Sequence, residues 1–388
     1  MKIGIITNWC SLDNYGQQLQ CWALQRYLKG LGHEPYLIKY LPQSPQWKKR
    51  VAYIWSRLFT SPKKKKAQLE EALAWIKSAE DNKQRRFGEF RQRNIHSTDV
   101  TYYSIKELRA NPPVADMYIT GSDQVWNDSL RNPNTAGNYL DFTPPHRKVK
   151  RVSYAASIGR NIEDREIKKF KQYLNHFDAI SLREQNACDF CHDLGFKDAI
   201  VVVDPTLLLN AEEYDAIDSS QDRNDTSDKP YVFVYLLNIR TSDDIYWNEF
   251  NRQISSEGLQ VKVVASSGYL PARDFLPGLT NTLASIPEWL GLVKHAEYVI
   301  TTSFHGIVFC LLYHKPFYAV LLNNEYSKAN TRISSLLGTV GLEKRIVSSA
   351  ADIRLCRNTS IDWKLVDEKL AQLRSASFDF LDKALTSD

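Results

Sequence analysis

Residues 296–322, AEYVITTSFHGIVFCLLYHKPFYAVLL, contain one complete strand–helix–strand pattern. Residues 298–300 are β-branched and aromatic, which predicts a buried strand. Apolar residues then recur at helical spacing from Ile307 to Leu312, and Pro316 ends this helix before a second apolar strand at 317–322. This order of elements is typical of a parallel α/β sheet.

His305 lies at the turn between this predicted strand and helix. In an open parallel sheet such turns line the carboxyl edge, where ligands bind, and the N-terminus of a helix favours anions. The alternative is a histidine that only completes its own turn. The small residue Gly306 favours a site, because it lets a ligand approach the backbone.

The length and composition indicate a globular protein of two domains. A chain of 388 residues with 43% hydrophobic residues exceeds one ordinary core. It contains no apolar run long enough to span a bilayer, and its first residues form a strand pattern instead of a signal peptide. Its six cysteines are scattered. We therefore expect a cytoplasmic protein.

Polar residues follow several further predicted strands. Residues 3–7 form the first strand, and 8–17 form a polar turn that lacks the G-x-G-x-x-G pattern of dinucleotide sites. Later predicted strands end in residues 121–127, 156–159, Arg183-Glu184 and Asp204-Pro205. Because parallel strands share one carboxyl edge, these residues are expected to gather there.

These patterns predict an α/β protein with two Rossmann-like, doubly wound domains that face a central cleft. We place the first domain at residues 1–206 and the second at 207–355. Residues 356–388 are expected to form a helix that returns to the first domain.

A basic helical insertion is expected in the first domain at about residues 46–96. Residues 46–94 contain 14 Lys and Arg against 5 acids, an excess of +9 in a chain of net charge +5. An apolar, Trp-bearing segment between two basic runs is suited to peripheral contact with anionic membrane lipid. The alternative is a solvated charge run, and we expect no nucleic acid partner.

The chain resembles the polysaccharide pyruvyl transferase family. The resemblance rests on residues 14–25 (NYGQQLQCWALQ), 121–127 (GSDQVWN), 153–159 (SYAASIG), 179–184 (AISLRE), 201–209 (VVVDPTLLL) and 299–317 (VITTSFHGIVFCLLYHKPF). It covers nearly the whole chain outside the basic insertion. The resemblance implies a glycosyltransferase-B-like fold.

The resemblance also implies a reaction. The pyruvyl group of phosphoenolpyruvate (PEP) would be transferred to sugar hydroxyls of a cell-surface polysaccharide or its lipid-linked precursor. The products would be a pyruvate ketal and phosphate. PEP is a co-substrate, and neither a metal nor an organic cofactor is expected.

The resemblance assigns roles to individual residues. The PEP-binding set is Arg183, His305, Ser303 and either Lys328 or Arg332. His305 is also a catalytic candidate, because it can clamp or protonate the leaving phosphate. Independently of the resemblance, Asn14, Gln17 and Gln18 offer neutral hydrogen bonds that suit sugar hydroxyls. The residues expected to contact the sugar acceptor are Asn14, Tyr15, Gln17, Gln18 and Trp126.

Two features depart from the family pattern. Better-studied members carry an acid in the first glycine loop, where this chain has Gln17 and Gln18, so Asp13 or Asp123 is expected to act as acid/base. Some members also carry an arginine shortly before the histidine, where Ser303 and Phe304 stand here. Two alternatives therefore remain, a glycosyltransferase that uses a nucleotide-sugar and a non-catalytic carbohydrate-binding scaffold.

Overall fold

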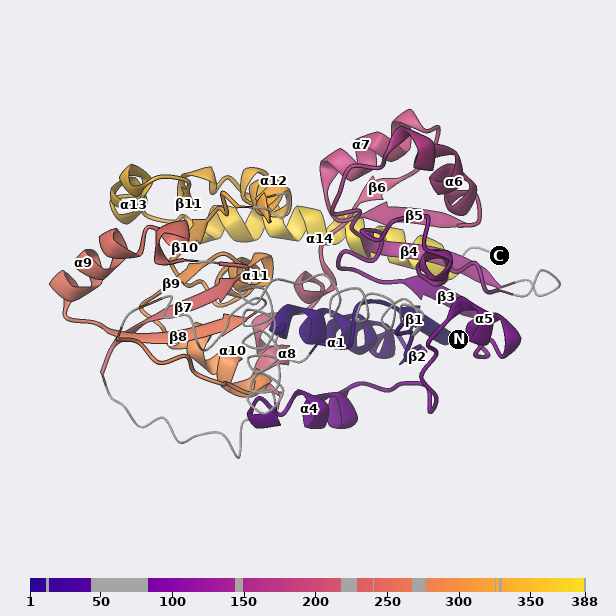
Figure 1. Cartoon of the computed structure of the whole chain (residues 1–388), viewed down its shortest axis with the longest axis horizontal. Helices are drawn as coiled ribbons and strands as arrows, with labels where there is room; N and C mark the ends of the chain where they lie inside the picture. The colour runs from indigo at the N-terminus through magenta and orange to yellow at the C-terminus, as the bar shows by residue number, and fades with distance from the viewer. Residues whose placement is uncertain are drawn as a thin grey trace, which may run out of the picture.

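The protein is described here by a computed structural model (Figure 1). The structure describes residues 1–386 except 12–13, 43–82, 144–148, 218–228, 240, 267–275, 277, 325 and 328–329. Most of the basic insertion therefore lies outside the described residues, and so does its proposed membrane contact. Within the described part of the chain, no helix is both long and apolar enough to cross a bilayer.

The first domain is built on a six-stranded parallel sheet of order β2-β1-β3-β4-β5-β6. Its strands are β1 (Lys2–Ile6), β2 (Glu34–Leu37), β3 (Met117–Thr120), β4 (Lys150–Ala156), β5 (Ala179–Leu182) and β6 (Ile200–Val201). Its helices are α1 (Tyr15–Gly30), α4 (Phe87–Asn94), α5 (Ile105–Ala110), α6 (Asp164–Leu174) and α7 (Gln185–Asp193).

The second domain repeats this plan with a five-stranded parallel sheet of order β11-β10-β9-β7-β8. Its strands are β7 (Tyr231–Leu237), β8 (Gln260–Ser266), β9 (Tyr298–Thr301), β10 (Phe317–Val320) and β11 (Ile346–Val347). Its helices are α9 (Trp247–Glu257), α10 (Ile286–Lys294), α11 (Phe304–Leu312), α12 (Asn330–Val340) and α13 (Ala350–Arg357), and the short α8 (Ala211–Asp215) precedes them.

In both sheets the order in which strands are added reverses next to the first strand of the domain. The reversal lies between β1 and β3 in one sheet, and between β7 and β9 in the other. Ligands of doubly wound folds bind at such switch points, outside the carboxyl ends of the strands. The segments after β3 and β9 carry Asp123 and His305, two residues singled out by the sequence.

The two domains share a buried aromatic contact. Tyr15 of α1 stacks on Trp289 of α10, with ring centroids 5.2 Å apart and planes 15° apart. The Tyr15 hydroxyl donates a hydrogen bond of 2.6 Å to the carbonyl of Ala284. This contact fixes the start of α1 against the second domain.

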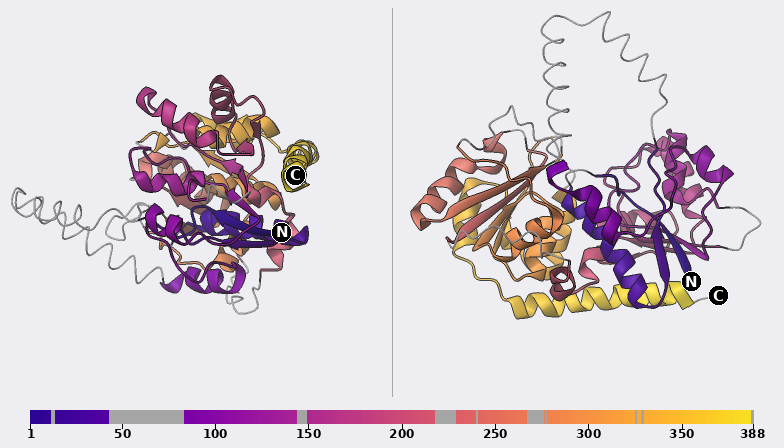
Figure 2. Two further views of the ribbon diagram at one scale, coloured as in Figure 1. Left: turned by 90° about the vertical axis from the view of Figure 1, so that its right-hand side faces the viewer. Right: turned by 90° about the horizontal axis from the view of Figure 1, so that it is seen from below.

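The long helix α14 (Trp363–Thr386) runs along both domains (Figure 2). On the second domain, Asp367 lies 2.9 Å from Nε2 of His314. On the first, the hydroxyl of Ser377 accepts a hydrogen bond from the amide of Val203 at 2.9 Å, and Phe378 stacks on Tyr27. The helix therefore ties the two sheets together.

The start of α1 differs from the sequence-based prediction of a polar turn through residue 17. The helix begins at Tyr15, because the Asn14 side chain accepts a hydrogen bond from the amide of Gln17 and caps the helix. Gly16 lies inside the helix although glycine has a low helix propensity, because a larger residue would collide with His305.

Candidate functional site

Four strand ends bring five ionisable residues to one place between the domains. Asp123 follows β3, Arg183 and Glu184 follow β5, Asp204 follows β6, and His305 lies in the first turn of α11 after β9. All five side chains are buried. A cluster of buried ionisable groups at the carboxyl edges of two sheets is typical of a functional site.

Asp204 is the centre of this cluster. One carboxylate oxygen accepts hydrogen bonds from the amide and hydroxyl of Thr206 at 3.0 and 2.6 Å. The other accepts from Ser122 at 2.7 Å and from Arg183 at 2.8 Å. It also lies 3.5 Å from Nε2 of His305. Asp204 therefore links Arg183 of one domain to His305 of the other.

The surroundings of Asp204 keep it ionised. Burial alone would raise the pKa of this carboxyl group, but His305, Arg183 and the Thr206 hydrogen bonds hold the pKa well below its usual value. The sequence placed Asp204 at a strand end but gave it no role, because its partners are far from it in the chain.

We expect Asp204→Asn to lower thermal stability. Removing one charge of a buried ion pair costs about 3–5 kcal/mol of unfolding free energy. Because the folded pKa is depressed, the carboxylate stabilises the wild type at every pH above about 4, and this contribution is lost as the pH falls further. Thermal midpoints between pH 7 and pH 2 should therefore fall less steeply below pH 4 in the variant. An unchanged midpoint at pH 7 would contradict this role.

His305 packs directly on Gly16 of the first domain. A Cβ atom added at Gly16 would lie 2.0 Å from Nδ1 of His305. Only glycine therefore lets α1 approach the imidazole so closely. His305 is buried, and its Nε2 has no hydrogen-bond partner. Ser303 precedes it as the N-cap of α11, where its hydroxyl accepts a hydrogen bond from the amide of Gly306.

Arg332 enters the cluster from α12. Its guanidinium lies 3.8 Å from Asp123 and 5.9 Å from the centroid of the Phe304 ring. The guanidinium of Arg183 lies 4.8 Å from the same ring. Both guanidiniums therefore lie near the Phe304 ring. Some family members carry an arginine shortly before the histidine, and here Arg332 supplies a second guanidinium from a different helix. Burial and the neighbouring Arg183 lower the pKa of Arg332 to about 10.

Asp123 lies within ion-pair distance of both arginines. Its backbone is left-handed (φ 77°), a conformation that costs energy in a residue other than glycine. Its carboxylate lies 3.8 Å from both Arg183 and Arg332 and accepts a hydrogen bond from Asn8 at 3.3 Å. Burial raises the pKa of Asp123, but Arg183, Arg332 and His305 outweigh it and lower the pKa.

Several donor nitrogens in the cluster are buried and have no hydrogen-bond partner. They are Nε and Nη2 of Arg183, Nε of Arg332 and Nε2 of His305. Buried polar groups in folded proteins are normally paired. These nitrogens belong to two arginines and a histidine, and apart from the 3.5 Å approach of Asp204 to His305 they have room for a further partner. Such a concentration of donors marks a place for an anion.

The residues predicted to bind the acceptor fall into two groups. Asn14 and Gln17 are partly exposed at the start of α1. Tyr15, Gln18 and Trp126 are buried: Tyr15 contacts the second domain, Gln18 donates to the carbonyl of Trp9, and Trp126 stacks on Tyr139. These three side chains pack against other residues of the protein. They expose almost no surface with which a sugar acceptor could make contact. Asp13 and Lys328 lie outside the described residues.

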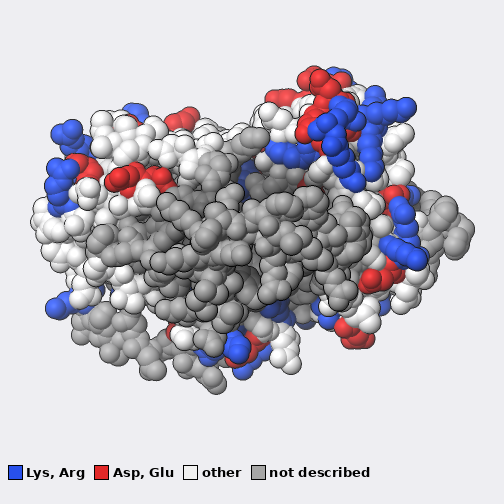
Figure 3. Space-filling model, viewed as in Figure 1, with Lys and Arg blue, Asp and Glu red and all other residues white. Residues whose placement is uncertain are grey.

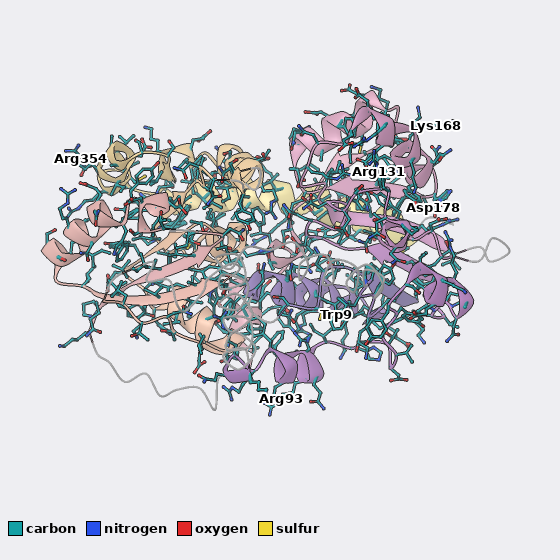
Figure 4. All side chains as sticks on the ribbon, in the orientation of Figure 1. Trp9, Arg93, Arg131, Lys168, Asp178 and Arg354 are labelled. Atoms are coloured by element: carbon teal, nitrogen blue, oxygen red, sulfur yellow. The ribbon has the colours of Figure 1, made fainter. Side chains whose placement is uncertain are left out.

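The lobe that carries α6 and α7 bears Lys and Arg side chains together with Asp and Glu side chains on the face shown in Figure 3. Arg131 and Lys168 are labelled on this lobe, well away from Trp9 beside α1 (Figure 4).

The chain has two parallel-sheet α/β domains with the glycosyltransferase-B fold. Among solved structures, a protein assigned as a UDP-N-acetylglucosamine 2-epimerase from Listeria monocytogenes matches with a TM-score of 0.52 and 9% identity, over 100% of this chain and 97% of that chain. The UDP-N-acetylglucosamine 2-epimerase from Rickettsia bellii matches with a TM-score of 0.49 and 12% identity, over 99% and 98%. At such identities the likeness to the Listeria structure shows the fold alone.

The chain belongs to the polysaccharide pyruvyl transferase family, whose family model matches residues 14–324. No curated protein matches the sequence significantly.

Proposed function

We propose that the protein transfers the pyruvyl group of PEP to two hydroxyls of a sugar acceptor, forming a ketal and releasing phosphate. The main support for this proposal is the set of nitrogen atoms on Arg183, Arg332 and His305 that have no hydrogen-bond partner. PEP presents a phosphate and a carboxylate, and two guanidiniums with one imidazole match these two anionic groups.

In this proposal Arg183 and Arg332 hold the two anionic ends of PEP, and His305 lies at the phosphate. A protonated His305 stabilises the charge that develops on the leaving phosphate and can donate a proton to it. Asp204 acts as a positioning residue, since it contacts both Arg183 and His305. No cofactor takes part in this scheme.

Asp123 is the proposed proton donor to the methylene carbon of PEP. In the structure the two arginines keep its carboxyl group deprotonated, because they lower its pKa and outweigh the effect of burial. Bound PEP, a trianion, would neutralise the positive charge of Arg183 and Arg332 and thereby raise the pKa of Asp123. Binding of PEP would thus prepare the acid that the reaction needs.

The acceptor in this proposal is a sugar of a cell-surface polysaccharide or of its lipid-linked precursor. The reaction would take place in the cytoplasm, at the inner face of the membrane if the precursor is lipid-linked. Asn14 and Gln17 remain the proposed acceptor contacts at the start of α1.

We expect PEP to raise the thermal midpoint of the purified protein. A ligand that binds only the folded state stabilises it by about 2.7 kcal/mol at a concentration 100-fold above its dissociation constant. UDP-N-acetylglucosamine, UDP-glucose and inorganic phosphate serve as comparison ligands. A shift with PEP that exceeds the shift with phosphate supports the proposal. A shift with a nucleotide-sugar alone would identify a glycosyltransferase, and no shift with any of these would favour a scaffold.

A further inference from the structure

A cavity of about 310 Å³ opens beside the cationic cluster, between the two domains. Its walls come from the loop after β4, from α7 and from the start of α12, which face each other across the top of Figure 1. The lining residues that matter here are Arg160, Asn161, Glu184, Asn186, Phe190 and Arg332. This volume is at the lower end of the range for small-molecule sites, which suits one sugar unit.

Glu184 is a buried carboxylate in the wall of this cavity, with only 3% of the residue exposed. Its Oε1 accepts a hydrogen bond of 2.7 Å from Ser157, which fixes the orientation of the group. Its Oε2 has no hydrogen-bond partner, and the nearest cation, Nε of Arg183, is 4.0 Å away. The second oxygen of this oriented carboxylate therefore lacks a hydrogen-bond donor. The hydroxyl group of a ligand would supply that donor.

The other two acids of the cluster, Asp204 and Asp123, do not combine a fixed carboxylate with an unpaired oxygen. Asp204 accepts four hydrogen bonds, and neither of its oxygens is unpaired. Asp123 accepts from Asn8 and lies between two guanidiniums. Glu184 is therefore the acid of the cluster that lines the cavity with a fixed carboxylate and one unpaired oxygen.

The rest of the wall carries groups that suit a hydroxylated ring. Asn161 and Asn186 offer amide groups that pair with sugar hydroxyls. Arg160 also lines the cavity, and its guanidinium is paired with Glu166 at 2.7 Å. Phe190 provides an aromatic surface for the apolar face of a ring. Arg332 belongs both to this wall and to the cationic cluster, so the cavity adjoins the proposed position of PEP.

We propose that this cavity holds the acceptor sugar and that Glu184 is the general base that deprotonates its attacking hydroxyl. This inference rests on the proposed function. The O–H bond of the hydroxyl breaks, its proton goes to Oε2 of Glu184, and the oxygen electron pair forms the bond to C2 of PEP. The electron pair of the C2=C3 bond takes a proton from Asp123 at C3, which becomes the methyl group.

The second sugar hydroxyl then displaces phosphate from C2, and its proton leaves with the phosphate. Glu184 returns its proton through solvent to Asp123. Over one turnover the two hydroxyl protons are thus found on the methyl group and on the phosphate, and no oxidant or reductant is needed.

The test uses the full chain with PEP and a set of probes, the methyl pyranosides of glucose, galactose, mannose and N-acetylmannosamine. Binding is measured by saturation-transfer NMR, and turnover by phosphate release. The variants are Glu184→Gln, which keeps the shape and the Ser157 contact, and Asn186→Trp, which fills the cavity. Asp189→Asn, an exposed change from carboxylate to amide on the same helix, is the matched control.

We expect at least one pyranoside to bind the wild type in the presence of PEP and to support phosphate release. Glu184→Gln should keep the PEP-induced thermal shift and pyranoside binding but release phosphate about 100-fold more slowly or worse. It should also lose the limb of the pH–rate profile that reports a base. Asn186→Trp should bind PEP without the pyranoside, and Asp189→Asn should match the wild type.

Phosphate release by Glu184→Gln within about tenfold of the wild type would overturn the role of Glu184. Pyranoside binding that survives in Asn186→Trp, or that is absent from the wild type, would overturn the assignment of the cavity. Failure of PEP to bind the wild type would instead overturn the proposed function. If Glu184→Gln does not fold, Glu184→Asp replaces it, with a slowed rate at unchanged PEP binding as the expected result.

Discussion

Arg183→Lys is expected to abolish the PEP-induced thermal shift and to lower pyruvyl transfer by about 10²–10³-fold, the effect of losing one preorganised donor group at an anion. Lysine keeps a positive charge beside Asp204, so the buried carboxylate is not left uncompensated. Its single ammonium group cannot hold Asp204 and also present a second pair of donors to a ligand. In the wild type, Nη1 bonds Asp204 and Ser122 while Nε and Nη2 are unpaired.

The control for this variant is Arg252→Lys, an exposed arginine paired with Glu249 on α9. It should bind PEP and transfer pyruvate as the wild type does. A PEP-induced shift that survives in Arg183→Lys would show that the anion is held elsewhere. Circular dichroism of both variants separates loss of binding from loss of folding.

Gly16→Ala is expected to reduce transfer by about 100-fold, since a displacement near 1 Å of a catalytic group can cost that much. The added Cβ would lie 2.0 Å from Nδ1 of His305, so the imidazole or helix α1 must move. Overpacking of this kind also destabilises a protein by about 1–3 kcal/mol. Transfer assays and thermal midpoints measure the two effects.

Gly30→Ala is the matched control, because Gly30 ends the same helix and a Cβ there would have nothing within 4 Å. Alanine should leave transfer unchanged and stability equal or slightly greater, by up to about 1 kcal/mol. If Gly16→Ala transfers pyruvate as well as Gly30→Ala does, the close contact between α1 and His305 has no catalytic importance.

The sequence predicted the fold class because each half of the chain repeats the same local pattern. The runs at residues 117–120, 179–182 and 231–237 are short and mainly apolar, and they form β3, β5 and β7 with these bounds. Strands covered on both faces show such runs, so local composition is sufficient to find them. The beginning of α1 was placed too late, because a glycine and two glutamines resemble a polar turn when the packing partner of Gly16 is unknown.

The candidate site was predictable only in part. Arg183 and His305 were singled out because each follows a strand, and a strand end is visible in the sequence. The roles of Asp204 and Glu184 were missed, although both also follow strands. Their importance depends on contacts with residues of other strands and of the other domain, which no local pattern records.

By itself, the sequence determined the two parallel α/β domains and the edge of each sheet at which polar residues collect, because strand periodicity and strand ends are local properties. Only the tertiary structure decided which of these residues meet. It buried Tyr15, Gln18 and Trp126, brought Arg332 of α12 beside Phe304, and left Oε2 of Glu184 unpaired at a cavity. The physical reason is that charge pairing and burial depend on distances between segments far apart in the chain, and these distances exist only once the two sheets are packed together.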